Sequence, residues 1–217
     1  MRLLMANIKI NLHLFLLAAL TFVTAALQSC NGHPSANKPI IDTERFRNGD
    51  LIFREGPSLN SEFVKAMSDN RFSHVGMLFK SKGRWMVVHA VPDESEEHET
   101  DFVKCEPVES FLDPSKARSS KCMRVRCDSY KALAAVKYAV VKADSHILFD
   151  NDYDLNDTSR LYCTELVWQA YRHQGINLVP RFTNVPMFGL GKTKDVIFPV
   201  NILKSSYNEK EWTCVVR

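Results

Sequence analysis

The chain has 217 residues, of which 45% are hydrophobic and 24% are charged, with 8 Gly and 9 Pro. This length suits one domain or two small ones, and the composition excludes a disordered, collagen-like or low-complexity chain. The formal net charge is only +3, which argues against a protein that binds nucleic acid through a strongly basic surface.

The N-terminal segment has the features of an export signal. Arg2 and Lys9 precede an apolar run over 12–27, and residues 1–29 contain no acidic side chain. A basic start, an apolar centre and small residues before a boundary are typical of a secretory signal peptide. The segment ends in Leu27-Gln28-Ser29-Cys30, which resembles a bacterial lipobox and implies cleavage before Cys30 and acylation of that cysteine.

These features predict a signal peptide of the lipoprotein type over 1–29, a polar tether over 30–45 and one folded domain over 46–217. The expected location is the cell envelope, where lipid on Cys30 anchors the protein to a membrane and the domain faces the periplasm or the exterior. An uncleaved anchor helix is the alternative, although an apolar run of 16 residues is short for a span that needs roughly 20.

Five cysteines follow Cys30, an odd number that leaves at least one thiol free or paired with another molecule. Cys122 and Cys127 lack the matching second pair of a zinc site. The sequence leaves open whether disulfides form among four of the five, which are Cys105, Cys122, Cys127 and Cys214. Residues 150–157 resemble a calcium loop in their acidic positions, but Leu155 and Leu161 stand where that loop needs Gly and Glu. We therefore expect no metal and no cofactor.

The rest of the chain alternates between strand and helix patterns. Short apolar or alternating runs predict strands at 50–54, 75–79, 85–91, 123–127, 196–198 and 212–216. Helical spacing predicts helices at 58–70, 130–143 and 161–173. The acidic run over 93–101 predicts a solvated loop. Together these elements indicate an α+β domain with a mainly antiparallel sheet packed against helices.

His74 and His89 lie on the two strands of a predicted hairpin with Gly83 in its turn. A turn at 81–82 makes the two residues face each other, and a turn at 82–83 makes them diagonal neighbours. Either register places both imidazoles on one face of the sheet, within about 8 Å. Histidines so placed can form a base and the group that orients it. The alternative is a pair of half-buried histidines that bond to the backbone.

Cys163 lies close to the start of the last predicted helix, since Asp157, Thr158 and Ser159 are good N-cap residues. The amides of a helix start and a nearby histidine are expected to lower the pKa of the thiol and raise the thiolate fraction. The alternative is a structural cysteine on the apolar face of the helix, or one half of a disulfide.

Several motifs occur in a characteristic order: Gly49-Asp50-Leu51-Ile52-Phe53, Ser73-His74-Val75-Gly76-Met77, Val88-His89-Ala90 and Tyr162-Cys163-Thr164-Glu165-Leu166. The strand motifs resemble those of NlpC-type papain-fold peptidases, in which the cysteine precedes the strands. Because the cysteine comes last here, the chain is more similar to the circularly permuted branch, the YiiX/YaeF-type papain-like amidases. The resemblance covers roughly residues 46–212 and implies a papain-like fold.

The same resemblance implies a role for each matching residue. Cys163 matches the nucleophile, His74 the general base, and His89 the polar residue that orients the base, a place that often holds Glu in the permuted branch. Tyr153, in an acidic Tyr-Asp segment, and Asp50 are candidates for substrate binding. Glu165 lies about 200° round the helix from Cys163, so we expect it to point away from the thiol and to serve as a structural hydrogen-bond or ion-pair partner.

The expected function is that of a cell-envelope cysteine hydrolase that cleaves amide bonds, in cell-wall peptides, through an acyl-enzyme. One alternative is a lipid acyl hydrolase or acyltransferase similar to the lecithin:retinol acyltransferase group, and another is a binding module that has lost turnover. The expected partners are an amide or peptide substrate and the membrane, without nucleic acid, and we expect a monomer.

Overall fold

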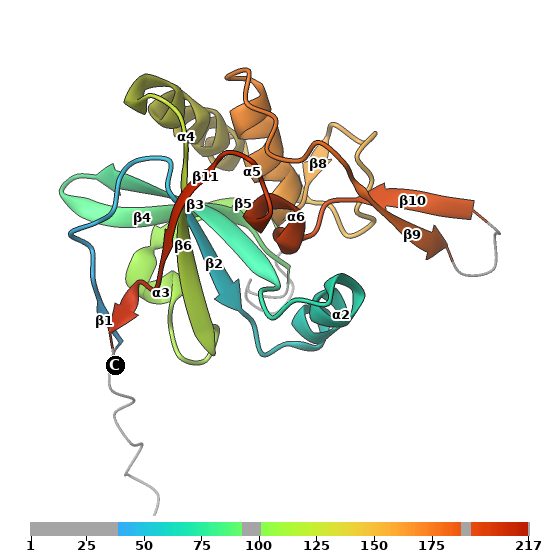
Figure 1. Cartoon of the computed structure of the whole chain (residues 1–217), viewed down its shortest axis with the longest axis horizontal. Coiled ribbons are helices and arrows are strands. Elements are labelled where there is room, and N and C mark those ends of the chain that lie inside the picture. Colours follow the sequence, from blue (N-terminus) through green and yellow to red (C-terminus); the bar gives the residue numbers. More distant parts are fainter. Residues whose placement is uncertain (1–38, 93–100, 188–191, 217) are drawn as a thin grey trace, which may run out of the picture. The chain divides into compact units, whose positions relative to one another are not determined.

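The computed structural model describes residues 39–92, 101–187 and 192–216 (Figure 1). The predicted signal peptide and Cys30 lie outside these residues. Within the described residues the first strand, β1 (Ile40–Ile41), pairs with β12 (Val215–Val216). None of the helices in the described ranges is long and apolar enough to cross a membrane.

A six-stranded sheet forms the centre of the domain, in the order β11-β6-β2-β3-β4-β5. All neighbouring strands in it are antiparallel, which confirms the predicted α+β class. The strands are β2 (Leu51–Glu55), β3 (His74–Ser81), β4 (Arg84–Ala90), β5 (Val103–Pro107), β6 (Ser119–Val125) and β11 (Asn208–Trp212).

Helices cover both faces of this sheet (Figure 1). Alternate residues of a strand point to opposite faces, and β2 shows this division. Leu51 and Phe53 join the larger core cluster, which contains the buried faces of α4 (Ser129–Asp144) and α5 (Cys163–Arg172). Ile52 joins the smaller cluster, which contains the buried residues of the short helix α3 (Val108–Phe111).

Three predicted helices are present, and α5 buries the apolar face expected from its spacing, whereas α2 (Leu59–Ser68) does not. The region 58–70 contains α2, whose N-cap Ser58 accepts a hydrogen bond from the Ser61 amide. Leu59, Phe63 and Met67 show the apolar spacing of this helix but are exposed, and only Val64 is buried. Helix α4 instead buries a face rich in alanine, which lets it pack close to α5.

The sequence analysis missed β5 and α3, because no element was predicted between residue 92 and residue 122. Val103 at the start of β5 is fully buried opposite Ala90 of β4. The acidic run lies largely at 93–100, outside the described residues. Of the predicted strand 196–198, only Val196 is in a strand: it ends β10 (Lys192–Val196), which pairs with β9 (Thr183–Met187). Phe198 is the N-cap of α6 (Pro199–Leu203).

The cysteines that the structure describes are all free thiols: Cys105, Cys122, Cys127, Cys163 and Cys214. Cys122 and Cys214 are fully buried neighbours in the core under α3. The predicted strand 212–216 contains the end of β11, this Cys214 and β12.

Candidate active site

Cys163 is the first residue of α5, directly after the short strand β8 (Arg160–Leu161). The predicted N-caps do not cap this helix, since Asp157 binds the amide and hydroxyl of Ser159 within the preceding turn. The N-cap is Tyr162 instead, whose side chain makes no capping bond. Packing and tertiary hydrogen bonds therefore fix the start of the helix.

Both neighbours of Cys163 are bound to the same residue, Ile197. The Ile197 amide donates to the Tyr162 hydroxyl at 3.0 Å, and the Thr164 hydroxyl donates to the Ile197 carbonyl at 2.6 Å. All three residues are buried. Hydrogen bonds on either side of the cysteine hold its backbone in place, as a nucleophile requires.

Cys163 lines a cavity of about 340 Å³ that His74 and Tyr153 also line. His74 is the first residue of β3, and Tyr153 lies in the loop between β7 (Leu148–Phe149) and β8. His89 is fully buried and is not part of the lining. The structure thus brings the predicted nucleophile, the predicted base and one predicted substrate contact to one cavity.

The two histidines are in direct contact. Ser81 pairs with Arg84, so the hairpin turns at Lys82-Gly83, which is the second of the two registers considered. In this register His74 and His89 are diagonal neighbours, and Nε2 of His74 lies 2.9 Å from Nδ1 of His89. The imidazoles therefore bond to each other, which favours the interpretation as a base and its orienting group over two separate histidines bonded to the backbone.

Gly76 makes this contact sterically feasible. A methyl group at this position would lie 2.4 Å from Cγ1 of Val87 and 3.2 Å from Cβ of His89. A larger residue in the Ser-His-Val-Gly motif would push β4 and its histidine away from His74.

His74 on β3 and His89 on β4 belong to a row of polar side chains on adjacent strands, and Glu106 of β5 extends this row. Glu106 was not predicted from the sequence. Its Oε1 lies 2.9 Å from Nε2 of His89, a close polar contact whose angles are not those of a linear hydrogen bond. Lys116 approaches the other carboxylate oxygen at 3.5 Å. Glu106 pairs with Val87, two residues before His89, so these residues are also diagonal neighbours. Sequence alone could not set this register, since β5 itself was not predicted.

Arg54 occupies the next position in the row, directly opposite His74 on β2. Its guanidinium lies 4.5 Å from the centre of the Phe111 ring, and Nη1 donates to the Phe111 carbonyl at 3.0 Å. The rings of His74 and His89 lie 5.6 and 5.1 Å from the same ring. Phe111 of α3 therefore packs against Arg54 and both histidines.

Burial determines the protonation of the thiol. Desolvation raises the pKa of Cys163 to about 11. Hydrogen bonds from the amides of Val75 and Thr164, and the charge of Arg54, act in the opposite direction but do not outweigh it. The expected net lowering of this pKa is therefore wrong. A thiol with this pKa is protonated near pH 7.

Asp50 does not lie at the cavity, contrary to the expectation that it binds substrate. Arg124 binds its two carboxylate oxygens at 2.8 and 2.6 Å, and the Arg47 amide donates to it at 2.8 Å. This fork-like pairing joins the start of β2 to β6. Desolvation nevertheless raises the pKa of the Asp50 carboxyl, with Arg124 opposing the shift.

Glu165 is a structural residue in this arrangement. It is fully buried, it does not line the cavity, and its Oε1 accepts a hydrogen bond from Gln169 at 2.9 Å. Desolvation, with a further contribution from Asp150, raises the pKa of this carboxyl to about 8.

The acidic loop before Cys163 is organised by Asp150. Its carboxylate accepts hydrogen bonds from the amides of Asp152 and Asp154. These bonds hold the backbone of the loop that follows Asp150 in a turn. The loop carries Tyr153 in a left-handed conformation, φ 54°, with its ring 5.1 Å from that of Tyr162. Among the described residues, no group of three or more His, Cys, Asp or Glu side chains could hold a metal ion.

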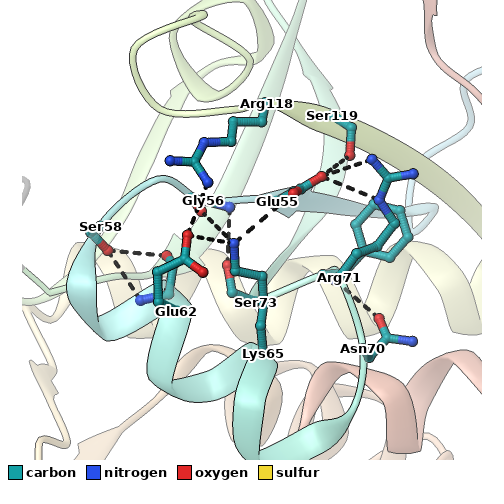
Figure 2. A network of polar contacts seen from close by, with 12 residues as sticks. Glu55, Gly56, Ser58, Glu62, Lys65, Asn70, Arg71, Ser73, Arg118 and Ser119 are labelled. Atoms are coloured by element: carbon teal, nitrogen blue, oxygen red, sulfur yellow. Dashed lines mark hydrogen bonds and ion pairs between the residues drawn. The ribbon is translucent and has the colours of Figure 1, made fainter.

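Helix α2 forms one wall of the cavity through Asn60, Ser61 and Val64. A polar network fastens this helix to the ends of β2 and β6 (Figure 2). Lys65 pairs with Glu62 at 2.7 Å and Arg118 pairs with the same carboxylate at 2.9 Å. The contact of Arg118 with Glu62 joins α2 to the start of β6, and Val64 packs the helix against Val196, Phe198 and Val200.

Glu55 is the second anchor of this network (Figure 2). It accepts hydrogen bonds from Arg71 and from Ser119, each at 2.8 Å. The bonds from Arg71 and Ser119 lower the pKa of this carboxyl. At the end of β2, Gly56 leaves room for α2, since a methyl group there would lie 2.1 Å from Oγ of Ser61.

An antiparallel sheet with a cysteine at the start of a helix and a histidine pair on the neighbouring strands defines a papain-like α+β hydrolase. The model of the family described as "permuted papain-like amidase enzyme, YaeF/YiiX, C92 family" matches residues 45–189, more than half of the chain. The protein therefore belongs to this family of cysteine peptidases and amidases, and it is an enzyme of the hydrolase class.

Comparison with solved structures agrees on the fold. The chain is similar to a crystal structure titled as the metalloprotein yiiX from Escherichia coli O157:H7, with a TM-score of 0.63 and 17% identity. The match covers 77% of this chain and 97% of that one. A comparison with curated proteins gives no match.

Proposed function

We propose that the protein hydrolyses amide bonds with Cys163 as nucleophile, His74 as general base and acid, and His89 as the residue that positions His74. The observation that carries this proposal is the cavity shared by Cys163 and His74, with His74 bonded to His89 behind it. Glu106 is added to the predicted set as a second positioning residue.

The row of polar residues accounts for the protonation states that the reaction needs. Glu106 is an acceptor, so it favours a proton on Nε2 of His89. Nδ1 of His89 then accepts from Nε2 of His74. This leaves the lone pair of His74 on Nδ1, the nitrogen that would exchange a proton with Cys163. In this proposal one carboxylate favours a single tautomer for each of the two histidines.

The reaction begins from a neutral thiol. As the substrate carbonyl enters the cavity, His74 takes the thiol proton and the sulfur attacks the carbonyl carbon, which gives a tetrahedral oxyanion. We expect the amide of Cys163, at the helix start, to stabilise this charge. His74 then protonates the leaving amine and a thioester remains. Water, deprotonated by His74, attacks the thioester and releases the acid and the thiol.

We propose cell-wall peptides as the substrates, cleaved at the cell envelope by a monomeric protein with a lipid anchor on Cys30. The export signal and lipobox-like segment in the sequence support this location, and the amidase family supports the bond type. The cavity lining also carries hydroxyl and amide groups from Ser58, Asn60 and Ser73, which suit a polar peptide better than an acyl chain.

A lipid substrate is the second candidate, and one specific observation favours it. Leu59, Phe63 and Met67 are spaced four residues apart on α2 and are exposed. This stripe lies on the helix that forms a wall of the cavity and resembles the apolar face of a helix at a membrane surface.

Incubation of the purified protein with peptidoglycan fragments, and separately with phospholipid vesicles, tests these proposals. We expect new amino and carboxyl groups from the fragments, no product from the vesicles, and no product from Cys163→Ala. Cys127→Ala, which changes a thiol outside the cavity, should retain activity. Acyl products from the vesicles alone would favour the lipid reaction, and equal turnover by Cys163→Ala would overturn both candidates.

A further inference from the structure

Two buried thiols, Cys122 and Cys214, lie together at one edge of the central sheet and have no part in the reaction described above. Cys122 is on β6, opposite Trp212 of the edge strand β11, and Cys214 follows Trp212 by two residues (Figure 1). Both side chains are fully buried in the smaller core cluster. The pairing of β11 with β6 therefore brings together two cysteines that are distant in the sequence.

The sulfur of Cys214 lies against β6. Its Sγ is 3.3 Å from Oγ of Ser120, and Ser120 projects from the same face of β6 as Cys122, because alternate residues of a strand share a face. The two thiols are also hydrogen-bonded to each other. Cys214 thus contacts two successive side chains on this face, and one of them is a second thiol.

The two thiols differ in acidity. The hydrogen bond with Cys122, helped by the one with Ser120, lowers the pKa of Cys214 against the effect of burial. Burial raises the pKa of Cys122. Cys214 is therefore the member of the pair that ionises first, and the thiolate is the form of cysteine that attacks a disulfide.

The backbone at Cys214 is held by few bonds. Thr213 and Cys214 belong neither to β11 nor to β12, and the Cys214 carbonyl accepts a hydrogen bond from the Asp42 amide at 3.0 Å. Beyond this bond the segment is paired only through the short ladder of β1 and β12. Such a segment opens more readily than the central strands, so Cys214 can meet an oxidant and its sulfur can adjust to the roughly 2 Å of a disulfide bond.

We infer that Cys122 and Cys214 form a disulfide when the protein meets a low-molecular-weight disulfide such as glutathione disulfide. The Cys214 thiolate attacks one sulfur of the oxidant, and a thiolate leaves. Cys122 gives up its proton to that thiolate and attacks the Cys214 sulfur of the mixed disulfide, which releases the second thiol. The protein loses two electrons and two protons, and the oxidant becomes two thiols. This inference is independent of the proposed function.

The bridge would fasten the C-terminal segment to the sheet. It joins β6 to the residue before β12 and closes a loop that contains α4 and α5. Because a cross-link over such a long loop restricts the unfolded chain, we expect oxidation to raise the melting temperature by more than about 5 °C. An oxidising compartment such as the bacterial envelope, the location proposed above, would maintain the bond.

Peptide mapping tests the inference directly. The purified, reduced protein is incubated with glutathione disulfide, quenched with acid, unfolded, alkylated with iodoacetamide and digested. Mass spectrometry should find the peptides of Cys122 and Cys214 joined, with the loss of two hydrogen atoms, while Cys163 remains open to alkylation. Recovery of both cysteines as alkylated thiols, or linkage of either one to Cys105 or Cys127 instead, would overturn the inference.

Variants connect the linkage to stability. Cys122→Ser and Cys214→Ser should each lose the rise in melting temperature on oxidation, whereas the control Cys127→Ser, which removes a partly exposed thiol just after β6, should keep it. An equal rise in Cys214→Ser would assign the stabilisation to other cysteines and contradict the inference. The peptide map of the parent protein decides the question even if one of these variants does not fold.

Discussion

Oε1 of Glu106 lies 2.9 Å from Nε2 of His89, on the side of the imidazole remote from His74. This carboxylate ends a row of side chains that crosses four adjacent strands, from Arg54 on β2 through His74 and His89 to β5. The carboxylate makes the two ends of the histidine pair different. Each neutral imidazole can both donate and accept a hydrogen bond, whereas the Glu106 carboxylate can only accept one.

Replacement of Glu106 by Gln should therefore impair catalysis while the protein remains folded. We expect kcat to fall by at least about tenfold with little change in KM, because the positive charge that forms on the histidines loses its counter-charge. The acidic limb of the pH–rate profile should also shift. Glu109→Gln on the neighbouring helix α3, whose carboxylate pairs with exposed Arg84, is the control. An unchanged pH profile in Glu106→Gln would assign Glu106 a purely structural role.

The pH dependence of alkylation tests whether the thiol is neutral at rest. Burial raises the pKa of Cys163 to about 11, so the thiolate fraction should increase about tenfold for each pH unit between 6 and 9. The rate of reaction with iodoacetamide, measured by mass spectrometry of the peptide that contains Cys163, should increase in the same proportion. A plateau near neutral pH would show a preformed thiolate–imidazolium pair instead.

Glu165 makes the stability of the protein depend on pH. Its pKa rises from 4.5 to about 8 on folding, so the folded state binds the proton more tightly than the unfolded state. Its contribution to stability is complete below pH 4.5 and is lost as the pH rises towards 8. Glu165→Gln, which has no charge to bury, should raise the free energy of unfolding by roughly 1–3 kcal/mol at pH 7 and by little at pH 4. Urea denaturation at both pH values measures the difference, and an equal effect at both would contradict the assignment.

Gly76→Ala should damage both stability and activity. The added methyl would collide with Val87 and crowd His89, so we expect a loss of about 1–3 kcal/mol and a lower kcat. Gly83→Ala is a useful comparison, because its φ of 82° is strained for alanine but its methyl would meet open space. That variant should lose stability and retain kcat. Equal kcat values for Gly76→Ala and the parent would show that the histidine pair tolerates a shift of β4.

Local patterns in the sequence were sufficient to predict the α+β class, the hairpin and the contact between the histidines. Gly83 and the strand periodicity restricted His74 and His89 to one face, whichever of the two turns was used. The order of the motifs also indicated the permuted family before any fold was known. The hairpin and the shared face of the histidines depend on residues that are near one another in sequence, and such patterns are the most reliable ones.

Features that depend on tertiary structure were not predictable in the same way. The start of α5 is set by Ile197, some 35 residues from Tyr162, so the polar residues before the helix gave the wrong N-cap. The pKa of Cys163 depends on how completely the cavity excludes water, which no motif encodes. Asp50 was expected at the cavity, but Arg124, from a strand 74 positions away, binds its carboxylate.

The pairing of β1 with β12 has a mechanical consequence. Ile40 and Ile41 are bonded to Val216 and Val215 across a ladder two residues long. A pulling force applied to Ile40 from its N-terminal side would act on this short ladder before it reaches the six-stranded sheet. Separation of β1 from β12 would leave that sheet, and with it the cavity, intact.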